Sequence, residues 1–365
     1  MAKKSEYFSG DRILATGAQY LILIGERANG KSYWVKHHCV KDAIDGNGEL
    51  IYLRRWKLEL KEDDVSDYFS DCDISKLSEG RYTDIKCSRG RIYALAYDDK
   101  GEVADRFLLG RTAALSGAEH LKSNVKRGAY ANLIYEEFST KNGYLGSDEP
   151  SQLQQFVSTV FGRDNGKIWL IANTVSRYNP YYNEWQLRQI QTMQPGDLDI
   201  YEMATGQYLD DGSEYKVRLA VEFCETTSGA RQGKLFFGNS AKNINTGVWE
   251  TEVCPHIPEP FDNFKLRYQI YLKYKDMGFS LKVIQHRERS ADYLLFICSE
   301  EEKPKRVKRW ISDEVTTDPL QTTKLLPLTG GDRLTIDLLK RGKIVYATNL
   351  TGTDFKAVLH DNKFW

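Results

Sequence analysis

The stretch YLILIGERANGKS, from Tyr20 to Ser32, decides the fold of this chain. It opens with an apolar run, Leu21 to Ile24, which is typical of a buried strand. Gly25 follows, and after four further residues the letters GKS begin a segment, 32–40, that is compatible with a helix. A strand, a loop of this spacing and a helix in this order predict a P-loop, which binds the phosphates of a nucleotide.

The residues of this loop have chemical reasons to be there. Gly25 and Gly30 let the backbone wrap closely around a phosphate, so that its N–H groups point at the oxygens. The start of the following helix adds the positive end of its dipole. We expect Lys31 to reach the β- and γ-phosphates and the Ser32 hydroxyl to bind Mg²⁺. The predicted nucleotide-binding residues are therefore Gly25, Glu26, Arg27, Ala28, Asn29, Gly30, Lys31 and Ser32, with ATP and Mg²⁺ as the cofactors.

Length and composition narrow the class of protein. A chain of 365 residues exceeds one ordinary domain, which predicts two domains or one domain with large insertions. Hydrophobic residues make up 41% and charged residues 28%, as in a soluble globular protein. No apolar run approaches the ~20 residues that span a membrane, and the first letters, MAKKSEY, lack the apolar core of a signal peptide. We therefore expect an intracellular protein without membrane contacts.

Cysteine usage and charge limit the partners further. The six cysteines are scattered, with no Cys-x-x-Cys pair, which predicts reduced thiols rather than zinc ligands or disulfides. We expect no metal beyond the Mg²⁺ that accompanies ATP. Because the formal net charge is +0, any contact with nucleic acid must be local.

A basic cluster follows the second expected strand, Leu50 to Leu53. It consists of Arg54, Arg55 and Lys57, with Trp56 among them. Solvated charge at the end of a strand is the ordinary explanation. Since this strand would lie beside the P-loop strand, the cations can instead contact phosphates of a nucleotide or of DNA. The spacing alone leaves both interpretations open.

Two acidic residues lie near the end of another apolar run, Leu133 to Phe138. A P-loop ATPase needs one carboxylate to hold the water shell of Mg²⁺ and a second to polarise the attacking water. Glu136 and Glu137 are placed for these two roles. A pair of surface glutamates is the simpler explanation of the letters, but downstream of a P-loop the pattern favours catalysis.

A further strand, Lys167 to Ala172, ends in Asn173 and Thr174. A polar residue at the tip of the strand beside the acidic one can sense the γ-phosphate and pass its loss to the following segment. Asn173 and Thr174 are therefore predicted coupling residues, although a capped helix start explains them equally well.

Strands and helical segments alternate up to about Arg188, which predicts an α/β fold with a mostly parallel sheet and helices on both faces. The alternation from Tyr82 to Tyr97 predicts antiparallel strands inserted at one edge. We assign residues 1–195 to this domain. Residues 196–260 are polar and rich in glycine and turns, which predicts a linker or a small intermediate domain.

The remaining residues, 261–365, have the pattern of a smaller α+β domain. Three alternating runs, at 265–272, 279–284 and 293–298, predict antiparallel strands, and a helix is expected at Asp332 to Arg341. Between them, the basic run Lys303 to Arg309 is either a nucleic-acid contact or a solvated loop.

Together these motifs resemble one family, the DNA-packaging motor ATPases (encapsidation proteins) of phi29-type tailed phages, which are relatives of terminase large subunits. The similarity covers the whole predicted ATPase part and thins out beyond it. The most family-specific stretches are Tyr52 to Leu60 and Asn179 to Tyr181. The others are Asp11 to Leu14, the P-loop with Arg27, Lys122 to Asn124, Leu133 to Phe138, Thr159 to Phe161, Asn173 to Ser176 and Asp211 to Tyr215.

The resemblance implies a P-loop NTPase fold of the ASCE type, followed by a vestigial RNase H-like nuclease domain. It implies a homo-oligomeric ring, a pentamer, at the portal of an empty capsid, where ATP hydrolysis draws double-stranded viral DNA inward. The C-terminal domain would contact DNA, the portal or a packaging RNA. Such a motor works in the host cytoplasm, docked transiently on the procapsid, and is absent from the mature virion.

The resemblance also implies roles for particular residues. Lys31 and Ser32 would hold MgATP, and Glu137 would activate water. Arg163, together with Lys122, would enter the site of a neighbouring subunit and neutralise charge in the transition state. Two further cations, Arg54 and Lys57, would face the DNA or the neighbouring active site.

Two positions depart from the family pattern. The first acid is usually aspartate, whereas this chain has Glu136, whose longer arm still reaches water-coordinated Mg²⁺. The trans-acting arginine usually follows Thr-Val-Phe directly, whereas Arg163 comes one residue later, after Gly162.

Nuclease activity is expected to be absent. A working nuclease of this type clusters acidic residues on adjacent strands to bind two metal ions, but the expected C-terminal strands carry mostly Lys, Tyr, Gln and Arg. Two other functions stay open at this point: a helicase or other nucleic-acid-stimulated ATPase, and a non-catalytic assembly factor gated by nucleotide. Glu137 argues against a factor without turnover.

Overall fold

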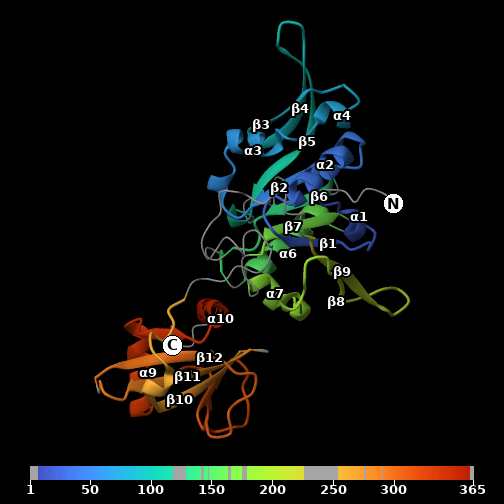
Figure 1. The fold of residues 1–365 in the computed structure, drawn as a ribbon. Coiled ribbons are helices and arrows are strands. Elements are labelled where there is room, and N and C mark those ends of the chain that lie inside the picture. Colours follow the sequence, from blue (N-terminus) through green and yellow to red (C-terminus); the bar gives the residue numbers. More distant parts are fainter. Residues whose placement is uncertain are drawn as a thin grey trace, which may run out of the picture. The chain divides into compact units, whose positions relative to one another are not determined.

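The computed structural model describes residues 7–117, 129–140, 144–146, 148–162, 166–174, 179–225, 254–274, 277–289 and 291–361. The chain divides into two compact units, Met1–Glu250 and Thr251–Trp365. Figure 1 traces the chain through both, and each unit has a sheet of its own.

The described part of the first unit contains a sheet of nine strands. Their order is β3-β4-β5-β2-β6-β7-β1-β9-β8, with parallel pairing from β5 to β9 and antiparallel pairing at both edges. One strand therefore separates the predicted P-loop strand β1 from the acidic strand β6, as in ASCE-type P-loop folds. The strands span Tyr20–Gly25 (β1), Glu49–Arg54 (β2), Asp84–Ser88 (β3), Arg91–Tyr97 (β4), Val103–Ala114 (β5), Tyr130–Glu136 (β6), Lys167–Asn173 (β7), Leu198–Tyr208 (β8) and Glu214–Phe223 (β9).

Both faces of the sheet centre are buried, so its strands are continuous apolar runs rather than alternating ones. Leu21 and Leu23 of β1 lie in the core on the α2 side, whereas Ile22 and Ile24 lie in the core on the α6 side. All four of these side chains are fully buried. The period of two residues along a strand explains why neighbours contribute to different cores.

Helices cover both faces of the sheet, as predicted. The first core contains side chains of α1 (Asp11–Leu14), α2 (Lys31–Ile44), α3 (Glu62–Phe69) and α4 (Ile74–Leu77). The second contains side chains of η2 (Leu115–Gly117), α6 (Glu149–Phe161), α7 (Pro180–Glu184) and η3 (Arg188–Gln191). The short helix η1 (Lys57–Glu59) follows β2. None of the helices in the described ranges is long and apolar enough to cross a membrane.

The prediction of a linker or intermediate domain at 196–260 is wrong for its described first half. Strand β9 pairs in parallel with β1 itself, from Tyr20 opposite Leu219 to Ile24 opposite Phe223, and β8 pairs with β9. The polar letters belong to the outer part of this hairpin, which is exposed, whereas residues 219–223 are buried in the sheet. The first domain therefore continues past residue 195. Residues 226–253 lie outside the described part.

The second unit contains a sheet with the order β14-β13-β10-β11-β12-β15. Its central strands are antiparallel, as predicted, and α9 and α10 pack against it. The predicted helix at Asp332 begins at Gly330 because Thr329 and Asp332 form a capping box. The elements are η4 (Phe261–Asn263), β10 (Phe264–Tyr274), β11 (Met277–His286), β12 (Tyr293–Ser299), β13 (Trp310–Ser312), β14 (Gln321–Thr322), α9 (Gly330–Lys340), β15 (Ile344–Tyr346) and α10 (Asn349–Asp361).

Candidate nucleotide-binding and catalytic site

The predicted P-loop connects the end of β1, at Gly25, to the start of α2, at Lys31. Gly25 has a φ of 155° and Gly30 a φ of 96°, values that side chains disfavour. A Cβ atom on Gly25 would lie 3.2 Å from Cys224 Cβ and from Asn29 Nδ2. The two glycines are therefore required by backbone geometry, as the spacing of the loop predicted.

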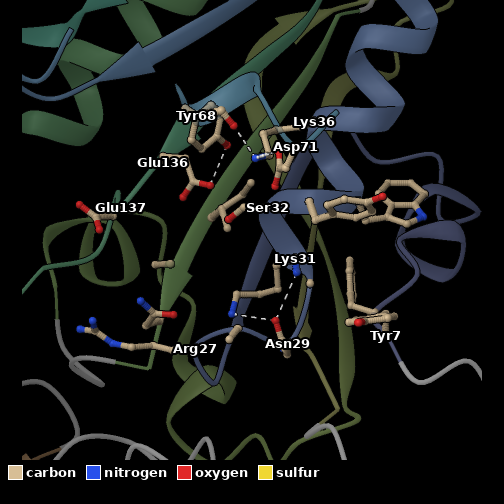
Figure 2. Close-up of a pocket in the computed structure, with 18 of the residues that line it drawn as sticks. Tyr7, Arg27, Asn29, Lys31, Ser32, Lys36, Tyr68, Asp71, Glu136 and Glu137 are labelled. Carbon is tan, nitrogen blue, oxygen red and sulfur yellow. Dashed lines mark hydrogen bonds and ion pairs between the residues drawn. The ribbon is translucent and has the colours of Figure 1, made fainter. Parts of the chain in front are cut away.

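A cavity of about 820 Å³ opens over this loop. It brings together predicted site residues from four separate stretches of the chain: Arg27 to Ser32, Arg54, the pair Glu136 and Glu137, and Asn173. Figure 2 shows Lys31, Ser32 and the two glutamates around one space. Aromatic side chains also line the cavity, from Tyr7, Phe8, Tyr33 and Trp34.

Lys31 is buried at the base of the cavity. Its Nζ donates to the Glu26 carbonyl oxygen at 2.6 Å and to Asn29 Oδ1 at 3.1 Å. Burial lowers the pKa of this ammonium group, since removal from water disfavours the charged form. A phosphate placed here would supply the negative charge that the buried cation needs.

Glu136 is the buried member of the acidic pair, at 8% exposure. Its Oε1 accepts a hydrogen bond from Tyr68 Oη at 2.8 Å. Burial raises the pKa of its carboxyl group, while hydrogen bonds from Ser32 and Tyr68 act in the opposite direction. Two oxygen donors, the Ser32 hydroxyl and this carboxylate, suit Mg²⁺, which prefers oxygen ligands.

Tyr68, which holds Glu136, itself packs against Lys36. Lys36 Nζ lies 4.3 Å from the centre of the Tyr68 ring and 2.6 Å from Asp71 Oδ1. Figure 2 shows Lys36 and Asp71 together beside Tyr68, whose hydroxyl group points to Glu136. No local pattern joins Tyr68 to a glutamate 68 residues away, so only the tertiary structure shows the pair.

Glu137 directly follows β6 and has a φ of 55°, in the left-handed region. Its side chain is 62% exposed and lines the cavity. The Oε2 atom accepts a hydrogen bond from Arg54 Nη2 at 2.8 Å. The same Arg54 nitrogen contacts Glu59 Oε1 at 2.8 Å, a partner the sequence did not reveal. Arg54 is thus held inside the site. The structure brings it to the predicted catalytic glutamate rather than to a free strand end.

The other predicted residues have different positions. Asn173 lines the cavity, whereas Thr174 is buried beside it and donates from its backbone N–H to the Gly25 carbonyl at 3.3 Å. Lys57 is exposed on η1 and does not line the cavity. Arg163 and Lys122 lie outside the described residues. Arg12, in the stretch Asp11 to Leu14, pairs with Glu222 at 3.1 Å.

Known proteins resemble this chain in sequence and fold. It is 29% identical over 269 residues to the DNA packaging protein of Bacillus phage B103, which covers 66% of this chain and 75% of that protein. It is 30% identical over 190 residues to the DNA packaging protein of Bacillus phage phi29, which covers 49% of this chain and 50% of that protein. The solved bacteriophage Phi-29 viral genome packaging motor assembly is similar in fold, with a TM-score of 0.55 over 98% of this chain and 99% of that chain at 19% identity.

A sequence profile of the Podovirus DNA encapsidation protein (Gp16) family matches residues 2–241. This match spans most of the first unit, including the P-loop, both glutamates and the strand β9. The resemblance inferred from the sequence motifs is therefore confirmed. The chain belongs to the Podovirus DNA encapsidation protein (Gp16) family.

Proposed function

We propose that this protein hydrolyses MgATP to move double-stranded viral DNA into a preformed capsid, as a subunit of a ring-shaped packaging motor. One observation carries the proposal: in a chain of the encapsidation family, a buried and an exposed carboxylate face Lys31 and Ser32 across a single cavity. That arrangement is suited to hydrolysis rather than to binding alone.

The residues divide the reaction between them. Lys31 and the backbone N–H groups of the P-loop bind the β- and γ-phosphates. Ser32 and Glu136 hold Mg²⁺, which when bound neutralises phosphate charge. Glu137 orients a water molecule and accepts its proton as the water oxygen attacks the γ-phosphorus. The bond between the γ-phosphorus and the bridging oxygen breaks, and ADP and phosphate leave.

The adenine ring has a suitable place in the same cavity. Tyr7, Phe8 and Trp34 line it, and Figure 2 shows Tyr7 on the side of the P-loop away from Glu137. Aromatic faces stack well on a purine base. This part of the site accounts for binding of a whole nucleotide rather than of phosphate alone.

Completion of the site in a ring is part of the proposal. Arg163 and Lys122 are assigned to enter from a neighbouring subunit, and Asn173 and Thr174 to couple loss of the γ-phosphate to movement. An arginine supplied in this way contributes ~10³ to 10⁵ in rate. The partners are DNA, the portal of the procapsid and a packaging RNA, in the host cytoplasm. The second unit is assigned as an RNase H-like domain without nuclease activity.

A buried carboxylate of the second unit is paired within the protein. Asp332, the buried carboxylate at the start of α9, accepts a hydrogen bond from Tyr268 Oη at 2.8 Å and lies 3.7 Å from Arg309. The Asp332 carboxylate is therefore already paired with side chains of the protein itself.

Steady-state ATP hydrolysis against protein concentration, with and without double-stranded DNA, tests the motor. Wild type, Glu137→Gln, Arg163→Ala and an equal mixture of the two variants are compared. We expect turnover to rise with concentration and DNA, to be lost in each variant alone and to return partly in the mixture. ATP turnover that depends neither on protein concentration nor on DNA would overturn the proposal.

A further inference from the structure

A second arginine contacts the main chain of Glu137, the residue proposed to activate water. Arg55 directly follows Arg54, but its side chain is only 6% exposed. Its Nη1 donates to the backbone oxygen of Glu137 at 3.2 Å, and its Nη2 to that of Phe138 at 2.6 Å. Arg54 therefore contacts the carboxylate of Glu137, whereas Arg55 contacts its main chain. Arg54 is the last residue of β2 and Arg55 is the first residue after it.

The remaining nitrogen of the Arg55 guanidinium group, Nε, is bound by a buried carboxylate. Arg55 Nε donates to Glu149 Oε1 and Oε2, at 3.0 and 2.9 Å. Glu149, the first residue of α6, is fully buried. A buried cation requires a counter-charge and hydrogen-bond partners of good geometry, and this pair provides both. Arg55 is therefore held rigidly against the turn that carries Glu137.

Other groups leave Glu149 little freedom to move. Its carboxylate also accepts hydrogen bonds from Tyr135 Oη at 2.9 Å, from Tyr181 Oη at 2.7 Å and from the Leu145 backbone N–H at 2.7 Å. These partners come from β6, α7 and the segment before α6. The carboxylate is thus fixed by three separate parts of the chain.

The backbone at Glu137 needs such support. Its φ of 55° is unfavourable for a residue with a side chain. Its N–H is fixed from one side, by the Ile171 carbonyl of β7 at 2.8 Å, and its C=O is fixed from the other by Arg55. We propose that Arg55, anchored by Glu149, is a positioning residue: it holds the left-handed turn that projects the Glu137 carboxylate into the cavity. This inference rests on the proposed role of Glu137.

Arg55→Lys separates this role from simple structural support. Lysine keeps the positive charge beside Glu149 but cannot bridge a carboxylate and two carbonyls, because it lacks the planar fork of arginine. The assay uses the full chain with double-stranded DNA and measures kcat and KM for ATP, binding of a fluorescent ATP analogue, and Tm. We expect kcat to fall by about 100-fold, the cost of misplacing a catalytic group, while KM and analogue binding stay within about twofold.

Asn132→Ala is the matched control. Asn132 is buried on the same strand as Glu136, at its other end, where it donates to Asp42 and accepts from Trp169. Its replacement should lower Tm and leave kcat unchanged, because it breaks buried hydrogen bonds at the end of β6 opposite to Glu136 and contacts neither glutamate of the site. Equal loss of kcat in the control and in Arg55→Lys at equal loss of Tm would overturn the proposal.

Two further variants make the result decisive. If Arg55→Lys does not fold, Glu149→Asp is measured instead, since it keeps the charge but draws the guanidinium away from the carbonyls. The same selective loss of kcat is then expected, and a wild-type kcat overturns the inference. Glu137→Gln is measured in parallel. If that variant still hydrolyses ATP, the proposed function fails; if it is inactive while Arg55→Lys remains fully active, only the positioning role fails.

Discussion

Arg54 Nη2 donates to Glu137 Oε2 at 2.8 Å, so the exposed carboxylate at the catalytic position is paired with a cation of its own chain. Arg54 itself is mostly buried, at 16% exposure, and is oriented by Glu59. A carboxylate held in this way is less mobile than a free carboxylate. A variant of Arg54 can therefore test whether this pairing restrains hydrolysis.

Arg54→Gln should release this restraint. We expect ATP turnover without DNA to rise relative to turnover with DNA, so that the stimulation by DNA falls by about tenfold or more, because one hydrogen bond between charged groups contributes about 1.5–3 kcal/mol. The measurement is the ratio of the two rates. Lys41→Ala serves as control, since Lys41 forms an exposed ion pair with Asp45 on α2; an unchanged ratio in Arg54→Gln would show that the pairing has no regulatory effect.

Lys31→Met should abolish binding of the nucleotide without unfolding the protein. The ammonium group is buried, which lowers its pKa and makes its charge costly in the absence of a phosphate. We expect the affinity for a fluorescent ATP analogue to fall by at least about tenfold, because a hydrogen bond to a charged group contributes about 1.5–3 kcal/mol. The rise in Tm on addition of MgATP should disappear. If the variant retains this rise in Tm, Lys31 does not contribute to nucleotide binding.

Tyr68→Phe should change the pH dependence of hydrolysis. Burial raises the pKa of the Glu136 carboxyl group, and the hydrogen bond from Tyr68 acts in the opposite direction. Without the hydroxyl, the pKa of Glu136 rises further, and the carboxylate needed for Mg²⁺ is lost at a higher pH as the solution is acidified. The acid limb of kcat/KM for MgATP should therefore move to higher pH.

Two measurements accompany that prediction. Raising the Mg²⁺ concentration should partly restore activity in Tyr68→Phe on the acid limb, because binding of the ion favours the ionised carboxylate. Tyr82→Phe is the control, since Tyr82 Oη contacts Asp105 in the edge strands and does not line the cavity. Identical pH profiles for wild type and Tyr68→Phe would contradict the assigned contact.

Val221→Ala tests whether β9 is part of the first domain. Val221 is fully buried and pairs opposite Ile22 of the P-loop strand. Removing its methyl groups should lower the free energy of unfolding by about 2 kcal/mol, measured by urea denaturation. Val103→Ala, at a site with 53% exposure, should change it by less than about 0.5 kcal/mol. Equal effects would mean that residues 214–223 do not share the core.

The sequence alone determined which residues form the candidate site. A P-loop is a local motif, so its strand, loop and helix could be read from adjacent letters, and the glycines at 25 and 30 have the positive φ values that such a loop demands. The two acids at the end of an apolar run were predicted for the same reason. In parallel sheets, ligands bind at the carboxyl ends of the strands, so polar residues at strand ends were the right place to search.

Only the tertiary structure decided which distant residues support that chemistry. Local letters could not show that β9 lies beside β1, because strand pairing depends on contacts far apart in the sequence and the exposed part of the hairpin reads as a polar linker. For the same reason, the sequence could not show that Tyr68 contacts Glu136. It also could not show that Arg54 and Arg55, adjacent in the basic cluster, have different partners. Their different partners, Glu137 for the first and Glu149 for the second, follow from packing of the chain, where burial forces each charge to find an opposite one.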